Sequence, residues 1–302
     1  MDNANQHRIG IDLGGTKIEI VVLGPGGAEM LRQRASTPPG YRETLQAIAG
    51  LVRECESRTG TGATVGIGIP GVISPATGLV KNANTGVLNG QRFDRDISAR
   101  LGREVRVEND ANCFALSEAT DGAGAGQGLV FGAILGTGIG GGIVLGGKLH
   151  RGPHRIAAEW GHNPLPWPHA DEVPGPPCRC GRWGCLERFA CGPALAEQAD
   201  GPGAHDPSGL PARAAAGDAV AREVLARHTD RLARGLAVVV NMLDPDVIVL
   251  GGGLSNMDHL YTELPPAIGR LVFSDVVHTP VVKNKHGDSS GVRGAAWLWP
   301  AG

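Results

Sequence analysis

Two stretches of the chain share one pattern, in which short apolar runs are separated by glycine pairs. The first is residues 8–31, "RIGIDLGGTKIEIVVLGPGGAEML", and the second is residues 129–152, "LVFGAILGTGIGGGIVLGGKLHRG". β-Branched runs bounded by glycines are typical of strands joined by tight turns. Each stretch therefore predicts strand, turn, strand, turn and strand. The repetition after about 120 residues predicts two related halves.

The rest of the chain alternates between helical and strand patterns. Residues 41–60 carry Leu45, Ile48, Val52 and Cys55 at helical spacing. A second, longer helix is predicted from residue 218 until Pro245 stops it. Short apolar runs predict buried strands; these are "TVGIGIP", "EVRVEND" and "DVIVLGGG". Strands that alternate with helices predict an α/β fold. Residues 199–217, interrupted by Pro and Gly, predict a surface loop or weak helix.

Composition and charge exclude several classes of protein. The 302 residues are enough for two domains, and 41% are hydrophobic, as in an ordinary globular protein. A net charge of -2 indicates no basic face for nucleic acid or an anionic membrane. The polar N-terminus "MDNANQHR" lacks a signal-peptide core, and no apolar run reaches the roughly 18 residues of a membrane span. Six cysteines are too few for a disulfide framework, so we expect a cytoplasmic protein.

Glycine is the outlier of the composition, with 48 residues gathered in clusters. "DLGGT" places Asp12 at a strand end before Gly14, Gly15 and Thr16, and "LGTGIGGG" repeats the turn without the acid. Glycine lets backbone N–H groups approach an anion. Two such turns facing each other would hold the phosphates of a nucleotide from both sides. The alternative is that both stretches are ordinary hairpins without a ligand. The pair of turns and the further "GGG" at residues 251–253 argue against this alternative.

Two familiar phosphate motifs fit the second stretch only in part. Gly136, Gly138 and Gly141 satisfy the dinucleotide fingerprint, but that fingerprint must open a helix. Here "GGIVLGGKL" follows and predicts a strand. Residues 142–148 satisfy G-x-x-x-x-G-K, but the next residue is Leu149, which cannot ligate magnesium as Ser or Thr does. We therefore set both motifs aside.

The stretch "ENDANC" places Asp110 after a predicted strand and before the helical "NCFALSEA". Open α/β sheets bind ligands beyond the carboxyl ends of their strands, so Asp110 is a candidate site residue. Taken alone, this aspartate fits a helix N-cap better than a functional group.

The third candidate is "CRCGRWGCLE", which holds Cys178, Cys180 and Cys185 as C-x-C-x4-C. Three thiolates are one ligand short of a tetrahedral zinc site. His162 lies sixteen residues upstream and completes a Cys3His set, with His169 and His154 as competitors. Cys191 is near in sequence but is expected on the next helix, and Cys55 and Cys113 are expected in the core. In a cytosolic protein this spacing favours zinc over a disulfide.

Together these motifs resemble the ROK family of sugar kinases and sugar-responsive repressors, from about residue 8 to the end. The stretches that carry the resemblance are "GIDLGGTK", "GIGIPG", "ENDAN", "LGTGIGGG", "EWGH", "CRCGRWGCLE", "DPDVIVLGGG" and "HGDSSGVRGAAWLW". Within the family, "GVISPATGLVKNANT" and "EWGHNPLPW" point to a proteobacterial fructokinase of the manno(fructo)kinase kind, with N-acetylglucosamine kinases next.

The resemblance implies an actin-like ATPase fold, in which two ribonuclease-H-like lobes surround a cleft that holds ATP and sugar. The N-terminal lobe would span residues 1–120, with a C-terminal helix at about 288–302 packing back on it. The C-terminal lobe would span residues 121–287 and carry the zinc loop. The cofactors implied are ATP, Mg²⁺ and a structural Zn²⁺.

The resemblance also implies a role for each matching residue. The nucleotide would be bound by Gly10, Asp12, Gly14, Gly15, Thr16, Lys17, Gly136, Thr137, Gly138, Gly140, Gly251, Gly252 and Gly253. The sugar would be bound by Gly71, Asn109, Asp110, Glu159, His162 and Glu187. Asp110 would act as the general base, and Asp12 would help to hold Mg²⁺ through water. Zinc would be held by His162, Cys178, Cys180 and Cys185.

These roles predict an ATP-dependent hexose kinase that phosphorylates fructose, with mannose or glucose weaker, at the 6-hydroxyl. An N-acetylglucosamine kinase or a glucokinase of the same family is the alternative. A sugar-responsive repressor needs a helix-turn-helix before the first glycine turn, for which the residues before Asp12 leave no room. A nicotinamide-dependent oxidoreductase lacks the helix that its fingerprint needs. The expected partner is a hexose substrate. The sequence does not decide whether the protein forms a homodimer.

Overall fold

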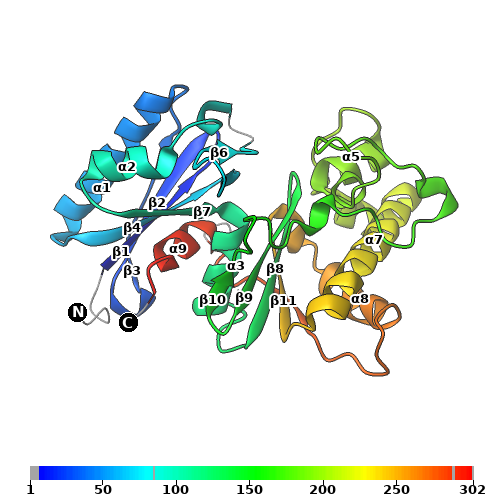
Figure 1. The fold of residues 1–302 in the computed structure, drawn as a ribbon. Coiled ribbons are helices and arrows are strands. Elements are labelled where there is room, and N and C mark those ends of the chain that lie inside the picture. The colour runs from blue at the N-terminus through cyan, green and yellow to red at the C-terminus, as the bar shows by residue number, and fades with distance from the viewer. Residues whose placement is uncertain (1–6, 84–85, 288–289, 301–302) are drawn as a thin grey trace. The chain divides into compact units, whose positions relative to one another are not determined.

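The computed structural model describes residues 7–83, 86–287 and 290–300, which form two compact units (Figure 1). The first unit comprises Met1–Ala125, Lys148–Ala157 and Asp288–Gly302, and the second comprises Gly126–Gly147 and Ala158–Gly287. Residues 1–6, 84–85 and both ends of the predicted helix 288–302 lie outside the described residues. The proposed boundary between residues 120 and 121 stays a prediction.

The first unit is built on a five-stranded sheet in the order β3-β2-β1-β4-β7. Its strands are β1 (His7–Leu13), β2 (Lys17–Leu23), β3 (Glu29–Ser36), β4 (Ala63–Ile69) and β7 (Val105–Asn109). The first three form an antiparallel meander, whereas β4 pairs with β1, and β7 with β4, in parallel. The predicted strands of residues 8–31 are confirmed.

Helices cover both faces of this sheet. On one face α1 (Tyr41–Thr59) and α2 (Phe93–Leu101) pack on the strands through a core that includes Ile11, Ile48 and Phe93. On the other face lie α3 (Asp110–Thr120) and α9 (Ser290–Trp297). The helical periodicity of residues 41–60 is confirmed, because its four apolar positions are all buried.

The helix α9 sits on glycines of the sheet. Gly10 and Gly66 are register partners on β1 and β4. A Cβ atom on Gly10 would lie 2.0 Å from the carbonyl oxygen of Val292, and one on Gly66 would lie 1.9 Å from that of Ala295. Only glycine therefore lets the helix backbone approach the sheet this closely.

The second unit repeats the sheet order. Its strands β9 (Ile139–Leu145), β8 (Leu129–Leu135), β11 (Val247–Gly251) and β12 (Val281–Lys283) are neighbours in that order. The strands β8 and β9 are antiparallel, and β11 pairs with β8 and β12 in parallel. The strand β10 (Lys148–His150) belongs to the first unit. Ile139 is the first residue of β9, so the second glycine turn leads into a strand and not into a helix. This confirms the reason for setting the dinucleotide fingerprint aside.

Five helices complete the second unit: α4 (Glu187–Ala190), α5 (Gly192–Asp200), α6 (Leu210–Ala215), α7 (Ala219–Leu243) and α8 (His259–Gly269). As predicted, α7 ends just before Pro245. The stretch 199–217 does hold the weak helix α6, but Leu210 is 1% exposed and joins the core, so this stretch is more than a surface loop.

Shorter elements connect these layers. They are β5 (Val72–Ile73), β6 (Val80–Lys81), and the 3-10 turns Pro25–Gly27, Gly86–Leu88, Trp160–His162, Ala170–Glu172 and Gly253–Asn256. Among the described helices, none combines the length and the apolar character that crossing a membrane requires.

Candidate functional site

Two carboxylates meet at the carboxyl ends of strands β1 and β7. Asp12 is the penultimate residue of β1, and Asp110 follows β7 as the first residue of α3. Burial, and then the negative charges of Asp110 and Glu19, raise the pKa of Asp12 to about 6, while Lys17 acts in the opposite direction. Such a pair of acids in one electrostatic field is suited to bind a cation or to exchange a proton.

Asn109 holds the start of helix α3. Its side-chain oxygen accepts from the N–H of Ala111 at 3.0 Å, and its amide nitrogen donates to the carbonyl of Gly71 at 3.1 Å. Gly71 has φ +108°, and a Cβ there would lie 2.7 Å from backbone atoms of Lys81 and Ala83. The expectation that Asp110 itself is the N-cap is therefore wrong, because Asn109 caps the helix and Asp110 lies inside it.

A buried acid supports this helix start from beneath. The Glu108 side chain is 2% exposed and accepts from the N–H of Asn109 at 3.0 Å and from the amide of Asn112 at 3.1 Å. Arg151 donates to its other oxygen, and Arg155 lies 3.9 Å away. Glu108 thus ties the backbone of the Asn109–Asp110 pair to two arginines of the segment 148–157.

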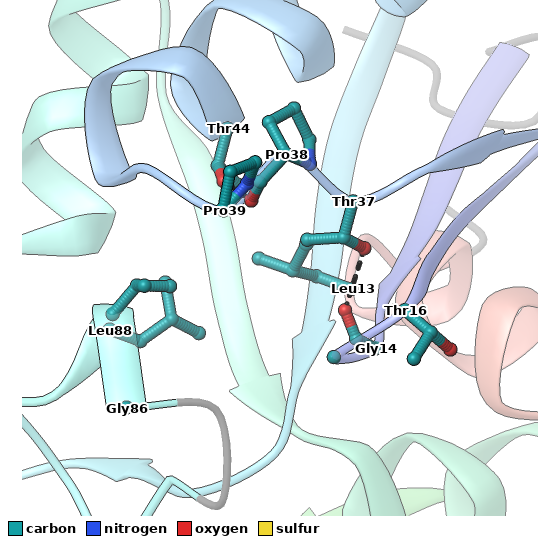
Figure 2. Close-up of a pocket in the computed structure, with 11 residues that line it drawn as sticks. Leu13, Gly14, Thr16, Thr37, Pro38, Pro39, Thr44, Gly86 and Leu88 are labelled. Carbon is teal, nitrogen blue, oxygen red and sulfur yellow. Dashed lines mark hydrogen bonds between the residues drawn. The ribbon is translucent and has the colours of Figure 1, made fainter.

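The first glycine turn lines a pocket of about 290 Å³, which Figure 2 shows. The turn closes with the Gly14 N–H donating to the Lys17 carbonyl at 2.9 Å, and Thr37 donates to the Gly14 carbonyl at 2.8 Å. The wall is completed by Leu13, Gly15, Thr16, Pro38, Pro39, Thr44, Gly86, Val87 and Leu88. The wall thus combines three threonines with apolar side chains, and Gly15 and Thr16 are exposed.

One predicted nucleotide contact has a different explanation. Gly10 is buried in the middle of β1, under the backbone of α9. Its missing side chain serves the packing of that helix on the sheet, and we remove it from the candidate site. The other predicted residues of the first unit, Asp12 and residues 14–17, lie at the end of β1 and in the turn.

The second glycine turn is held by Glu187. Gly136 donates to the Gly138 carbonyl at 2.9 Å and accepts from the N–H of Gly192 at 2.8 Å. Glu187 accepts from the N–H of Ile139 at 2.9 Å. A Cβ on Gly138 would lie 2.5 Å from that carboxylate, so the turn has no room for a side chain there.

A cluster of four possible metal ligands lies in the same unit. The nearest ligand atoms of His162, Cys178, Cys180 and Cys185 all lie within 4.8 Å of one another. The thiol of Cys178 lies 3.4 Å from Nδ1 of His162, and those of Cys180 and Cys185 are 3.6 Å apart. Of the competing histidines, His169 lies 3.6 Å from Asp230 instead. Cys191, Cys55 and Cys113 are buried outside the cluster.

The loop that carries the cluster is anchored at both ends. Leu165 donates to the Gly184 carbonyl at 2.8 Å, which joins the two ligand-bearing segments. Arg234 of α7 donates to the Trp167 carbonyl at 2.9 Å and to the buried Glu172 at 2.8 Å. Burial favours the neutral acid, but hydrogen bonds from Arg234 and Arg231 outweigh it and lower the pKa of Glu172 to about 2. The anchor is therefore ionic.

Two further groups of predicted residues, Glu159 and the glycines at the end of β11, lie next to elements of the second unit. Glu159 precedes the turn Trp160–His162, and the indole of Trp160 donates to the Gly140 carbonyl at 2.8 Å. At the end of β11, Gly252 has φ +79°, and a Cβ there would lie 2.4 Å from the Leu135 carbonyl. This turn therefore lies against the strand that leads into the second glycine turn.

The sequence motifs did not predict two of the residues described above, Glu108 and Thr37. Glu108 lies in the quoted "ENDAN", but the prediction rested on its neighbours Asn109 and Asp110. No sequence signal points to Thr37, which the fold brings to Gly14 from the end of β3.

Comparison with known proteins places these features in a family. The model of the ROK family matches residues 8–301. The N-acetyl-D-glucosamine kinase of Pasteurella multocida (strain Pm70) is 41% identical, over 97% of this chain and 99% of its own. That of Vibrio cholerae serotype O1 is 40% identical, over 96% and 98%.

Solved structures agree with the fold. A ROK hexokinase from Thermus thermophilus superposes with a TM-score of 0.85 at 33% identity, covering 96% of this chain and 97% of its own. A ROK glucokinase from Streptomyces griseus, in complex with glucose and AMPPNP, gives 0.79 at 30% identity, covering 98% and 100%. The predicted α/β fold of the actin-like ATPase type is confirmed.

The prediction of a fructokinase is wrong, because relatives at about 40% identity over nearly the whole chain are N-acetyl-D-glucosamine kinases. The two stretches that suggested fructose have structural roles. The described part of the first stretch, residues 71–83, forms the tight turn at Gly71 and the β5-β6 hairpin. The second, "EWGHNPLPW", holds one metal-cluster ligand and the pairing of Leu165 with Gly184. Such scaffold features do not distinguish one hexose from another.

Proposed function

The chain belongs to the ROK family and is a sugar kinase, and on that premise we propose that it transfers the terminal phosphoryl group of ATP to the 6-hydroxyl of N-acetyl-D-glucosamine. The observation that carries the choice of sugar is the 38–41% identity to eight N-acetyl-D-glucosamine kinases, each over nearly its whole length. The 6-hydroxyl is the primary alcohol of this sugar and its least hindered nucleophile.

Asp110 is the general base of this proposal. Asn109 caps α3, and one oxygen of Asp110 accepts from the N–H of Ala111 at 2.8 Å, which orients the carboxylate at the helix start. It accepts the proton of the 6-hydroxyl as the sugar oxygen bonds to the terminal phosphorus and the bond to the departing ADP breaks. Asn109, tied to Gly71, would hydrogen-bond the sugar beside it.

Asp12 and the two glycine turns would neutralise the charge of the phosphates. Asp12 would help to hold a magnesium ion, which would supply positive charge to the phosphates. Asp12 fits this cation because burial, and then the charges of Asp110 and Glu19, destabilise its ionised form, and a cation would offset both effects. Lys17 and the N–H groups of residues 15–16 and 137–138 would contact the phosphate oxygens, because those of Gly14 and Gly136 close their own turns.

Zinc fits the four-ligand cluster. Thiolates bound at about 2.3 Å to a tetrahedral zinc lie about 3.8 Å apart. The observed 3.6 Å between Cys180 and Cys185 is close to that separation. Four protein ligands leave no open position, so the metal would be structural. It would fix the ring of His162, whose second nitrogen then presents an N–H to the sugar together with Glu159 and Glu187.

A panel of sugars tests the proposal. ADP formation is measured with N-acetyl-D-glucosamine, N-acetyl-D-mannosamine, glucose, mannose and fructose at saturating Mg-ATP. We expect the highest kcat/KM with N-acetyl-D-glucosamine, by at least tenfold over glucose. Glucose is the second candidate, because of the similarity to the Streptomyces griseus glucokinase. A higher kcat/KM for glucose would replace the proposed substrate, and no ADP with any of these sugars would refute the proposal.

A further inference from the structure

The metal loop carries a cation that the functions described so far do not use. Arg179 lies between Cys178 and Cys180, and its side chain is 64% exposed. Its guanidinium Nε lies 3.6 Å from Oε1 of Glu187, which is long for an ion pair. An exposed arginine in a long ion pair gains little energy from it and can exchange it for a stronger anionic partner.

The position of this guanidinium is defined by the second glycine turn. Glu187 uses its other oxygen to accept from the N–H of Ile139 at 2.9 Å. A Cβ built on Gly138 would lie 3.8 Å from the Arg179 Nη2 atom. The cation therefore lies beside the turn of residues 136–138, whose exposed Thr137 marks its open side.

The backbone holds Arg179 in place. The Cys178 N–H donates to the Arg182 carbonyl at 2.8 Å, and the Gly181 N–H donates to the Cys178 carbonyl at 3.0 Å. Arg179 is thus a central residue of a tight turn, with a possible metal ligand on each side of it. The backbone of Arg179 is thus constrained, whereas its long, exposed side chain can change partners.

Other arginines of this unit are engaged elsewhere. Arg231 and Arg234 bind Glu172, Arg227 binds Asp171, and Arg213 binds Asp200 and Asp218. Arg179 is different because its partner Glu187 is itself hydrogen-bonded to the glycine turn. An anion bound at that turn would meet the guanidinium directly.

We propose that Arg179 binds the terminal phosphate of ATP at the turn of residues 136–138 and stabilises the phosphoryl group during transfer. This inference rests on the proposed function, which assigns the phosphates to that turn. Arginine presents two parallel N–H groups to a phosphate, and its charge counts most where the transferring group has the most negative charge. On binding ATP the guanidinium leaves Glu187, whose second oxygen then becomes available to the sugar.

The test compares Arg179→Ala with Arg182→Ala, an exposed arginine of the same loop, so that both variants lose one positive charge. Binding of Mg-ATP, Mg-ADP and N-acetyl-D-glucosamine is measured by calorimetry, and turnover by ADP formation. For Arg179→Ala we expect kcat to fall about 10²–10³-fold and the Kd of ATP to rise about tenfold. The Kd values of ADP and of the sugar should stay within threefold of wild type. Arg182→Ala should change none of these by more than twofold.

Further measurements separate this role from a structural one. Metal content and thermal stability of Arg179→Ala should match wild type, and Arg179→Lys should recover at least tenfold of the lost kcat. A rise in the sugar Kd with unchanged ATP binding would mean that Arg179 only positions Glu187, and would overturn the inference. Equal effects of the two alanine variants would overturn it as well. If the wild type fails to phosphorylate N-acetyl-D-glucosamine, the proposed function fails, while the difference between ATP and ADP binding still decides the role of Arg179.

Discussion

The two units share one strand order but differ at one position of their glycine turns. Aligning "GIDLGGT" with "GAILGTG" places Asp12 of β1 opposite Ile134 of β8. In both units an antiparallel hairpin carries the turn, and a parallel strand pairs with its first strand. The hairpin is therefore a common scaffold, and the carboxylate at its end is specific to the first unit.

What packs beside each turn differs as well. The first turn is joined to Thr37 and preceded by Asp12, whose pKa is raised in part by the charge of Asp110. The second is joined to Glu187 and, through it, to Arg179 of the metal loop. We infer that the first unit carries the proton acceptor, the cation site and the sugar contact of Asn109, whereas the second carries the metal loop and the sugar contacts of His162, Glu159 and Glu187. The following predictions test this division.

The largest effect is expected from Asp110→Asn. The amide can still hydrogen-bond a sugar hydroxyl but is a very poor proton acceptor, so kcat should fall by roughly 10²–10⁴. The sugar Kd should stay within a few-fold of wild type. Steady-state kinetics and calorimetry measure the two quantities. Asp94→Asn, also in the first turn of a helix of this unit, is the matched control. Turnover within threefold of wild type in Asp110→Asn would exclude Asp110 as the base.

The second prediction uses the raised pKa of Asp12, which has no counterpart at Ile134. The pKa is about 6 in the folded protein and about 4 in the unfolded chain. Between these two pKa values the folded state binds more protons than the unfolded chain, so the free energy of unfolding falls as the pH rises. The loss of stability caused by ionised Asp12 is complete above about pH 6. Asp12→Asn should remove it and raise the free energy of unfolding by roughly 2–3 kcal/mol at pH 8.

Urea unfolding of wild type and Asp12→Asn across pH 4–8 measures this difference, which should vanish near pH 4. Asp96→Asn of the same unit serves as the control. The same variant should lose Mg²⁺-dependent turnover, so stability and activity change in opposite directions. A difference in stability that is constant across this pH range would contradict the raised pKa.

The third prediction concerns the metal loop of the second unit. Cys180→Ser, or removal of the metal by a chelator, should loosen the contacts of His162, Glu159 and Glu187 together. We expect the sugar KM to rise about tenfold, the usual effect of disturbing a metal's surroundings, before nucleotide affinity changes. Metal per chain is measured first, and sugar and nucleotide are then titrated separately. Cys191→Ser, a buried thiol outside the cluster, is the control. Equal losses of both affinities would show that the metal supports the whole unit.

The smallest effect is expected at Arg151, which tethers the helix start of the first unit. Arg151→Gln leaves the buried Glu108 without its nearest cation and should shift Asn109, lowering kcat/KM about fivefold. Arg155→Gln is the matched control, because its distance of 3.9 Å to Glu108 indicates a weaker contact. Identical kcat/KM values for both variants would remove the positioning role from Arg151.

Local patterns predicted most of the scaffold. The strands of both hairpins, the helices α1 and α7 and the meeting of His162 with three cysteines follow from periodicity and ligand spacing. The role of Gly10 could not be predicted, because it depends on Val292 of α9, which is 282 residues away in the chain. The N-cap at Asn109 was missed because two neighbouring residues can both cap a helix, and the tertiary contact to Gly71 decides between them.

The sequence motifs could not predict the sugar substrate, for a different reason. The resemblance was carried by residues that hold turns and metal ligands, and these suit any hexose. Arg179 was overlooked because its importance depends on its distance to a turn about 40 residues earlier in the chain.

The central claim is that this chain transfers phosphate to the primary hydroxyl of N-acetyl-D-glucosamine, with Asp110 as base. The most direct measurement is phosphorus and carbon NMR of the product formed from ATP and this sugar, by wild type and by Asp110→Asn. We predict N-acetyl-D-glucosamine 6-phosphate in equal amount to ADP with wild type, and at least a hundredfold slower formation with the variant. Phosphate on another hydroxyl, or ADP without any sugar phosphate, would contradict the account.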